Sequence, residues 1–138
     1  MLDLSAEASA ALQERLRTES IAWITTVTAD GQPQSSPVWF LWDDGEFLVY
    51  AQPRSWKVRN IRAHPKVSLH LNSDAGGGRV VTFEGSARIG EGDPLAHEAA
   101  AYLAKYREGI AGIGMTPEQM AAEYSTALRI TPSRIRVY

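Results

Sequence analysis

The 138-residue sequence contains no cysteine. This absence excludes thiol nucleophiles, cysteine-ligated zinc and iron–sulfur sites, and disulfide frameworks. The sequence also lacks a strong charge of either sign, because 14 Lys and Arg residues nearly balance 16 Asp and Glu residues. No global electrostatic field draws the chain to nucleic acid or to a membrane surface, so we expect neither as a partner.

Long hydrophobic runs are missing as well, and none approaches the roughly 20 residues that a membrane-spanning helix needs. The first residues, Met1–Ser5, include an acidic side chain and no basic one, unlike a signal peptide. We therefore expect a cytoplasmic protein. The hydrophobic fraction of 44% is ordinary, and the length suits one domain over residues 1–138 that buries its own core.

No set of side chains with catalytic spacing is present. His64, His70 and His97 fall in different expected elements without metal-ligand spacing, so no metal is expected. Carboxylate pairs placed for acid–base work, Gly-x-Ser-x-Gly elbows and Gly-x-Gly-x-x-Gly fingerprints are absent. The catalytic residues are therefore unknown from the sequence, and a bound cofactor would have to carry any chemistry.

What is present is a series of short segments that are rich in β-branched and aromatic residues or that alternate in polarity. Asp30-Gly31 and Asp44-Gly45 predict hairpin turns that join the first three segments into a meander. Pro37 predicts an edge strand, a bulge or a ligand-facing position, and Gly85 a bulge or bend. The expected strands are Ile21–Thr28, Pro33–Trp42, Glu46–Ala51, Lys66–Asn72, Arg79–Ile89 and Leu128–Tyr138.

Six antiparallel strands with few residues left over predict a mainly β protein with a closed or split barrel and flanking helices. A parallel sheet is disfavoured, because the first three strands leave no room for crossover connections. Helices are expected at residues 5–19, 55–64, 93–106 and 116–125, starting at Ser5, Ser55, Asp93 and Thr116. Residues 1–19 would then form an N-terminal helix, residues 20–138 the barrel, and the glycine-rich segment 109–114 a loop.

The start of the second expected helix combines groups that bind anions. Its first turn carries Arg54, Ser55, Lys57 and Asn60, and the N–H groups and dipole of a helix start attract negative charge. This pattern favours a phosphate pocket. A capped, solvated surface helix explains the same residues. Trp39 and Trp56 flank this helix in chain order and are candidates for a flat ligand site, with core packing as the alternative.

Four motifs, in this order, resemble the pyridoxamine-phosphate-oxidase-like superfamily of FMN-binding split β-barrels, from about Ser20 to Tyr138. The resemblance is greatest to small reductases that use the deazaflavin coenzyme F420 in place of FMN. The motifs are Asp30-Gly31-x-Pro33-x-x-x-Pro37-Val38-Trp39-Phe40, Pro53-Arg54-Ser55-x-Lys57-x-x-Asn60-Ile61, His64-Pro65-Lys66-Val67-Ser68 and Arg129-Ile130-Thr131-Pro132-x-Arg134-Ile135-Arg136-Val137.

The resemblance implies a six-stranded split barrel that works as a homodimer, with the cofactor in a groove between the subunits. The cofactor phosphate would lie near the helix start at 54–60, and the tricyclic ring along the second and third strands. The cofactor-binding residues implied in this way are Ser36, Pro37, Val38, Trp39, Tyr50, Ala51, Gln52, Arg54, Ser55, Trp56, Lys57 and Asn60.

The function that follows is an oxidoreductase that passes hydride from reduced F420 to an unsaturated organic acceptor such as an enone, a quinone or a tetrapyrrole. Hydride transfer needs no nucleophile or metal, which agrees with their absence from the sequence. The alternatives are an FMN-dependent oxidoreductase of the same fold and a non-catalytic flavin or deazaflavin carrier. A dimer is also expected because Trp39, Phe40 and Trp42 make the second strand apolar on both faces.

Overall fold

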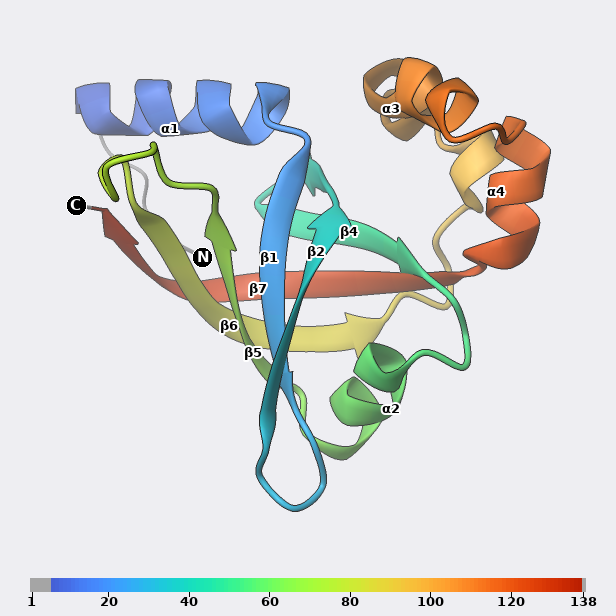
Figure 1. Ribbon diagram of the computed structural model, residues 1–138, viewed down its shortest axis with the longest axis horizontal. Coiled ribbons are helices and arrows are strands. Elements are labelled where there is room, and N and C mark those ends of the chain that lie inside the picture. Colours follow the sequence, from blue (N-terminus) through green and yellow to red (C-terminus); the bar gives the residue numbers. More distant parts are fainter. Residues whose placement is uncertain (1–5, 138) are drawn as a thin grey trace.

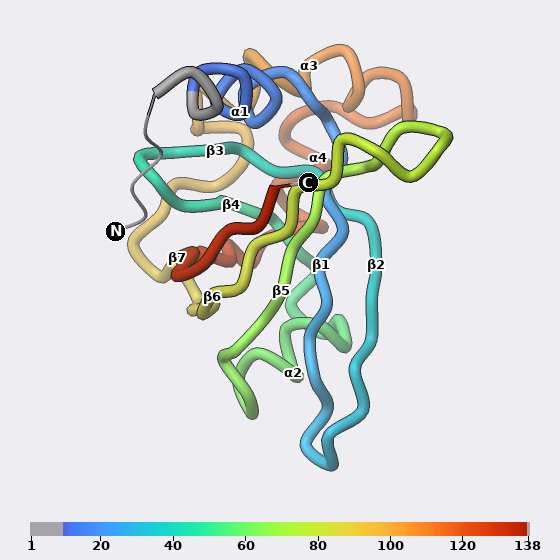
Figure 2. The backbone as a smooth tube through the Cα atoms, turned by 90° about the vertical axis from the view of Figure 1, so that its left-hand side faces the viewer, coloured from blue at the N-terminus to red at the C-terminus, as the bar shows by residue number. Residues whose placement is uncertain are grey.

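The computed structural model describes residues 6–137, so the expected helix start at Ser5 and the final residue Tyr138 lie outside the described residues. One antiparallel sheet dominates the fold, with strand order β2-β1-β5-β6-β7-β4-β3. Figures 1 and 2 show this sheet strongly curled into a half-barrel. The strands are β1 (Ile21–Val27), β2 (Pro33–Trp39), β3 (Leu41–Asp43), β4 (Glu46–Ala51), β5 (Lys66–Leu71), β6 (Val81–Ile89) and β7 (Thr126–Val137).

The sheet has seven strands, so the expectation of six was wrong. The segment 33–42 is divided at Phe40 into β2, which pairs with β1, and β3, which pairs with β4. These two strands occupy opposite ends of the strand order, so the expected three-stranded meander is wrong too. Because only Phe40 separates them, the two edges of the sheet stay close together and the sheet must curl (Figure 2).

The break at Phe40 has a specific cause in helix α3 (Ala100–Gly112). The Phe40 N–H donates to the Tyr106 hydroxyl at 2.8 Å, and the Phe40 carbonyl accepts from the Lys105 amine and the Tyr106 hydroxyl, both at 2.8 Å. A buried backbone group left without a partner is costly. The backbone can leave the ladder at this residue because α3 supplies the partners that a neighbouring strand would have supplied.

Two of the expected helix starts are confirmed by their caps. Ser55 caps α2 (Trp56–Ala63) by accepting from the Val58 N–H, and Thr116 forms a capping box with Gln119 at α4 (Pro117–Glu123). α1 (Ala6–Thr18) and α2 lie toward opposite ends of the barrel, whereas α3 and α4 form a pair at one side (Figure 1).

The helix expected at 93–106 and the loop expected at 109–114 were both misplaced. A 3-10 turn, η1 (Ala96–Glu98), precedes α3, and α3 continues through Gly112. Gly109 can lie in this helix because it packs against Trp39, where an added Cβ would be 3.3 Å from the indole ring. Glycine, which disfavours helix locally, thus allows close packing between α3 and Trp39 at this position.

Two apolar clusters fill the molecule. The first lies inside the barrel and is closed by α1 and α2, and the second lies between the outer face of β4 and the helices α3 and α4. Pro37 lies on the edge strand β2, and Gly85 lies at a register shift between β6 and β7, as expected. Among residues 6–137, none of the helices is long and apolar enough to cross a bilayer.

Candidate functional site

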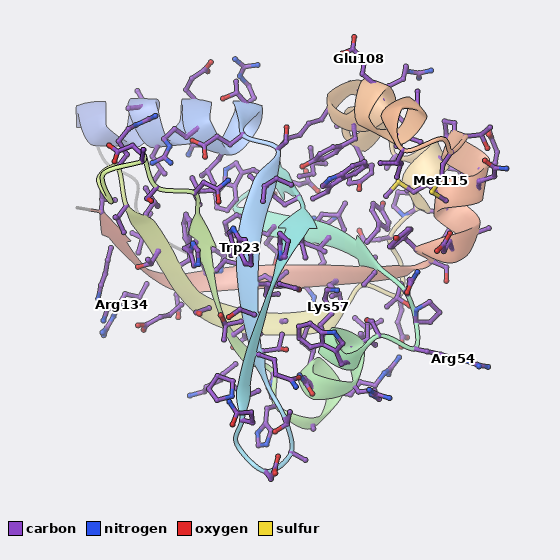
Figure 3. All side chains as sticks on the ribbon, in the orientation of Figure 1. Trp23, Arg54, Lys57, Glu108, Met115 and Arg134 are labelled. Carbon is purple, nitrogen blue, oxygen red and sulfur yellow. The ribbon has the colours of Figure 1, made fainter. Side chains whose placement is uncertain are left out.

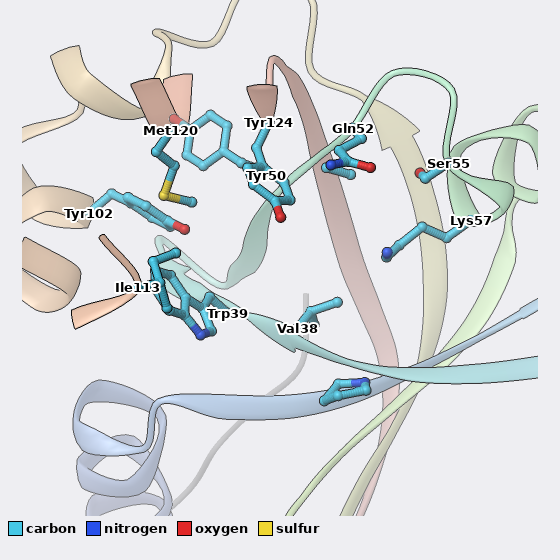
Figure 4. Close-up of a pocket in the computed structure, with 12 residues that line it drawn as sticks. Val38, Trp39, Tyr50, Gln52, Ser55, Lys57, Tyr102, Ile113, Met120 and Tyr124 are labelled. Carbon is cyan, nitrogen blue, oxygen red and sulfur yellow. The ribbon is translucent and has the colours of Figure 1, made fainter. Parts of the chain in front are cut away.

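A cleft of about 410 Å³ lies between β2, β4, the start of α2 and the α3–α4 pair (Figure 4). This volume is within the range of small-molecule sites. The structure brings most of the predicted cofactor-binding residues together around this cleft, from three separate segments of the chain. These are Pro37, Val38 and Trp39, then Tyr50, Ala51 and Gln52, and finally Ser55 and Lys57.

Lys57 supplies the positive charge of the cleft. Figure 4 shows its amine reaching into the cleft from the first turn of α2, beside Ser55. Burial lowers the pKa of this amine, and no carboxylate pairs with it among residues 6–137. The amine lies 5.3 Å from the centroid of the neighbouring Trp56 ring. A half-buried ammonium without a counter-ion at a helix start is a site for an anionic group.

The opposite wall of the cleft is aromatic. Trp39 stacks on Tyr106 with ring centroids 4.8 Å apart and planes within 2°. Tyr50 packs edge-on against Tyr102 at 4.8 Å and donates its hydroxyl to the Pro94 carbonyl at 2.7 Å. Burial, supported by the nearby Asp93 carboxylate, raises the pKa of Tyr50 to about 12, so this hydroxyl keeps its proton. The wall is aromatic, and its indole and phenol rings offer apolar surface to a planar ligand.

Four of the predicted residues lie away from this lining. Arg54 is exposed and points outward into solvent (Figure 3). Asn60 is buried, and its amide donates to Thr26 Oγ1 and Gln34 Oε1, both at 2.9 Å. Asn60 thus ties α2 to the β1–β2 hairpin. The remaining two are Ser36 and Trp56, which are both half-buried and are not part of the cleft lining.

Sequence reasoning missed the part of the cleft contributed by α3 and α4. Tyr102 and Met120 line it from these helices, and Ile113 and Tyr124 line it from just beyond their C-terminal ends. In the sequence, Tyr102 falls within the helix expected at residues 93–106, and no spacing distinguishes it from its neighbours. The docking of α3 and α4 against β4 brings these side chains to the cleft, and this docking has no local signal. Among residues 6–137, no cluster of His, Asp and Glu is arranged to hold a metal ion.

The family to which the chain belongs follows from its sequence match to a known family. The sequence matches the family described as pyridoxamine 5'-phosphate oxidase over residues 8–138. The chain belongs to this family. The match confirms the resemblance that the four motifs indicated, and the curled antiparallel sheet with flanking helices agrees with the split barrel of this family.

Solved structures agree with this assignment. A conserved hypothetical protein from Mycobacterium tuberculosis is 25% identical with a TM-score of 0.76, and the match covers 100% of this chain and 88% of that chain. A structure named as an F420 reductase is 21% identical, with a TM-score of 0.67 and coverages of 90% and 94%. The heme-storage protein HutZ from Vibrio cholerae is 17% identical, with a TM-score of 0.67 and coverages of 99% and 95%. The family fold thus occurs in proteins named for different ligands.

Proposed function

We propose that this protein is an oxidoreductase that binds the deazaflavin coenzyme F420 in the cleft and uses it to reduce an unsaturated organic acceptor. The observation that carries the proposal is the pairing of an aromatic wall with the half-buried amine of Lys57 at the opposite side, which has no carboxylate partner among residues 6–137. A coenzyme with a planar ring at one end and a phosphate along its side chain needs both features. The likeness to a structure named as an F420 reductase supports this choice.

The residues of the cleft have separable tasks under this proposal. Lys57, the Ser55 hydroxyl and the free N–H groups of the α2 start bind the phosphate. Residues 37–39 and 50–52 flank the ring, orient it and exclude water from one of its faces. The bound reduced coenzyme supplies the hydride, which explains why the protein needs no nucleophile or metal of its own.

Two other functions remain as alternatives. An FMN-dependent oxidoreductase would use the same aromatic wall and the same phosphate contacts. A non-catalytic carrier is favoured by a different observation, because the cleft lining contains no histidine, aspartate or glutamate to serve as a general acid or base. The heme-storage protein with this fold shows that such a role exists among similar structures. Oxidation of bound reduced F420 by enones, quinones or tetrapyrroles would argue against the carrier.

The homodimer remains a prediction, but the apolar faces of the segment 33–42 are covered within one chain. Trp39 is covered by Tyr106 of α3, and the Trp42 indole packs against Phe47 and donates to Gln13 of α1, so one chain covers both faces. The better argument is the open rim of the cleft, where Ile113 is 55% exposed. A second subunit would close this rim, and light scattering at micromolar concentration measures the mass in solution.

The test of the phosphate site is the substitution Lys57→Ala. A charge-assisted contact to a partly desolvated phosphate is worth about 1.5–3 kcal/mol, so we expect F420 affinity to fall by about ten- to a hundred-fold. Fluorescence quenching at fixed salt measures the affinity. Lys57→Arg keeps the charge and should recover most of the loss.

Arg62→Ala is the matched control, because Arg62 is an exposed cation in the last turn of the same helix. We expect its F420 affinity to equal that of the parent protein. Equal affinities for Lys57→Ala and the parent would contradict the proposed phosphate site and, with it, the proposed function. Much tighter binding of FMN than of F420 by the parent would instead favour the FMN-dependent alternative.

A further inference from the structure

The hydroxyl of Tyr102 is a buried polar group in the wall of the cleft that lacks a hydrogen-bond partner among residues 6–137. The side chain is 0% exposed and lines the cleft from α3. Figure 4 shows this hydroxyl directed toward the cleft, beside Met120. Buried polar groups in folded proteins nearly always have partners, so an orphan that faces a ligand-sized cleft indicates a partner that the chain does not provide.

The tyrosines around Tyr102 fix its ring without satisfying its hydroxyl. Tyr50 packs edge-on against the Tyr102 ring at 4.8 Å between ring centroids, and Tyr106 packs against it at 4.9 Å with a tilted ring. The Tyr50 hydroxyl is already used by the Pro94 carbonyl, and the Tyr106 hydroxyl by the backbone of Phe40 and the Ser20 carbonyl. Each neighbour therefore holds the Tyr102 ring in place while its own polar tip points elsewhere.

The protonation state of Tyr102 follows from its surroundings. Burial raises the pKa of its hydroxyl far above the usual range, and the nearby Tyr106 and Tyr50 raise it further. At neutral pH the group carries its proton, so it meets a ligand as a donor and not as an anion. Its natural partner is a neutral acceptor such as a carbonyl oxygen.

We propose that Tyr102 is a positioning residue whose hydroxyl donates a hydrogen bond to a carbonyl oxygen of the planar ligand in the cleft. The identity of that ligand as a flavin-type ring, whose pyrimidine portion carries carbonyl oxygens, rests on the proposed function. The flexible thioether of Met120 lies beside the hydroxyl and can move aside when the ligand enters (Figure 4). The wall thereby sets the orientation of the ring, while Lys57 holds the phosphate.

The first test compares ligands with and without a carbonyl group. We expect Tyr102→Phe to weaken binding of F420, FMN and the quinone menadione by about ten-fold, the usual worth of one hydrogen bond that would otherwise leave a group unpaired. Binding of 2-methylnaphthalene, which has the rings of menadione without its carbonyl oxygens, should not change. An equal loss for both members of this pair would overturn the proposal, because the ring and not the hydroxyl would then be responsible.

The second test uses the unliganded protein and Tyr106→Phe as the matched variant. Tyr102→Phe removes an unpaired buried hydroxyl, so its melting temperature should equal or exceed that of the parent. Tyr106→Phe removes the partner of the Phe40 backbone, and its melting temperature should fall by about 2–5 °C with little change in ligand affinity. A comparable fall for Tyr102→Phe would show a structural partner for its hydroxyl and overturn the proposal.

The outcomes separate this proposal from the proposed function. Binding of F420 that is equal in the parent and in Tyr102→Phe would overturn the role of Tyr102 and leave the function standing. Tyr102-dependent binding of menadione or FMN, together with no binding of F420, would support the role of Tyr102 and overturn the function. If the parent binds none of the probes, both fail.

Discussion

Strand β4 separates two apolar environments that differ in the polar atoms they contain. Phe47, Val49 and Ala51 point into the barrel, where every fully buried member of the cluster is Leu, Ile, Val, Phe or Ala. Leu48 and Tyr50 point the other way, into a cluster with α3 and α4. That second cluster is rich in tyrosine, and its surface forms one wall of the cleft.

The difference shows how one strand can serve stability on one face and binding on the other. A hydrocarbon core needs few hydrogen-bond partners, and inside the barrel the buried Thr26 hydroxyl has its partner in the Asn60 amide. A tyrosine layer is nearly as apolar, but each ring brings a hydroxyl that must find a partner. Tyr50 and Tyr106 find theirs in the backbone, and the unpaired hydroxyl of Tyr102 is left at the cleft.

The sharpest test of this comparison uses two adjacent residues on opposite faces of β4. Phe47 is 0% exposed and packs edge-on against Phe83, and Leu48 is 2% exposed in the tyrosine layer. Phe47→Ala should cost about 3–5 kcal/mol and Leu48→Ala about 2–5 kcal/mol of unfolding free energy in urea titrations. At low temperature, where both remain folded, only Leu48→Ala should weaken F420 binding, because only Leu48 supports the cleft wall.

An equal loss of affinity in both variants would break the comparison. It would mean that the barrel interior and the cleft wall respond as one packed unit. Isothermal titration with F420 gives the affinity, and circular dichroism at the same temperature confirms that each variant is folded.

Helix α2 also has one face that packs into the barrel and another that faces the cleft. Val58 and Ile61 join the barrel cluster, and Asn60 bonds Thr26 and Gln34 of the hairpin beneath it. Lys57, on the adjacent face, reaches the cleft. A single short helix therefore contributes both to the stability of the barrel and to the proposed phosphate site.

Asn60→Ala tests whether this residue belongs to the barrel side. It leaves the buried Thr26 hydroxyl without its donor, so we expect a loss of about 1–3 kcal/mol in the free energy of unfolding. F420 affinity of the folded protein should stay within about two-fold of the parent, whereas Lys57→Ala should show the opposite pattern. A ten-fold loss of affinity in Asn60→Ala would show instead that Asn60 contributes to cofactor binding, as the family resemblance implies.

Local signals in the sequence predicted the local features of the fold. Ser55 and Thr116 cap helices, Asp44-Gly45 turns a hairpin with positive φ at both residues, and Gly85 marks a register shift. The two caps and the turn depend on one residue and its immediate neighbours, whereas Gly85 also lies close to the backbone of Thr131 on β7. The chemistry of caps and turns is therefore sufficient to place the two caps and the turn.

The features that the sequence did not predict depend on residues far apart in the chain. The strand breaks at Phe40 because Tyr106 and Lys105 supply its backbone partners, and α3 continues through Gly109 because of Trp39. The same holds for the cleft. The motifs indicated the cleft residues on β2, β4 and α2. Tyr102 reaches the cleft only because α3 packs against β4, and the local sequence does not predict this packing.

The smallest effect that we expect is on the pH dependence of stability, from Lys105, which lies at the boundary between the barrel interior and the tyrosine layer. Its amine lies 3.8 Å from the centroid of the Phe40 ring and donates to the Phe40 carbonyl. Burial lowers the pKa of Lys105 to about 8, although Glu19 opposes this shift. An unfolded chain holds the lysine proton up to its ordinary pKa of 10.5, so between pH 8 and 10.5 the unfolded state binds more protons than the folded state.

The sign of the pH effect follows directly. Stability rises with pH wherever the unfolded state binds more protons, so Lys105 should make the parent progressively more stable from pH 8 to 10.5 relative to Lys105→Met. The gain is reduced by solvent screening, because this side chain is only half-buried. Tyrosines whose pKa is raised, such as Tyr106, lose stability above about pH 10, but they do so in both proteins and cancel in the difference. Urea midpoints at half-unit pH steps measure this difference, and a flat difference across the window would show that the Lys105 amine is as well solvated in the folded protein as in the unfolded chain.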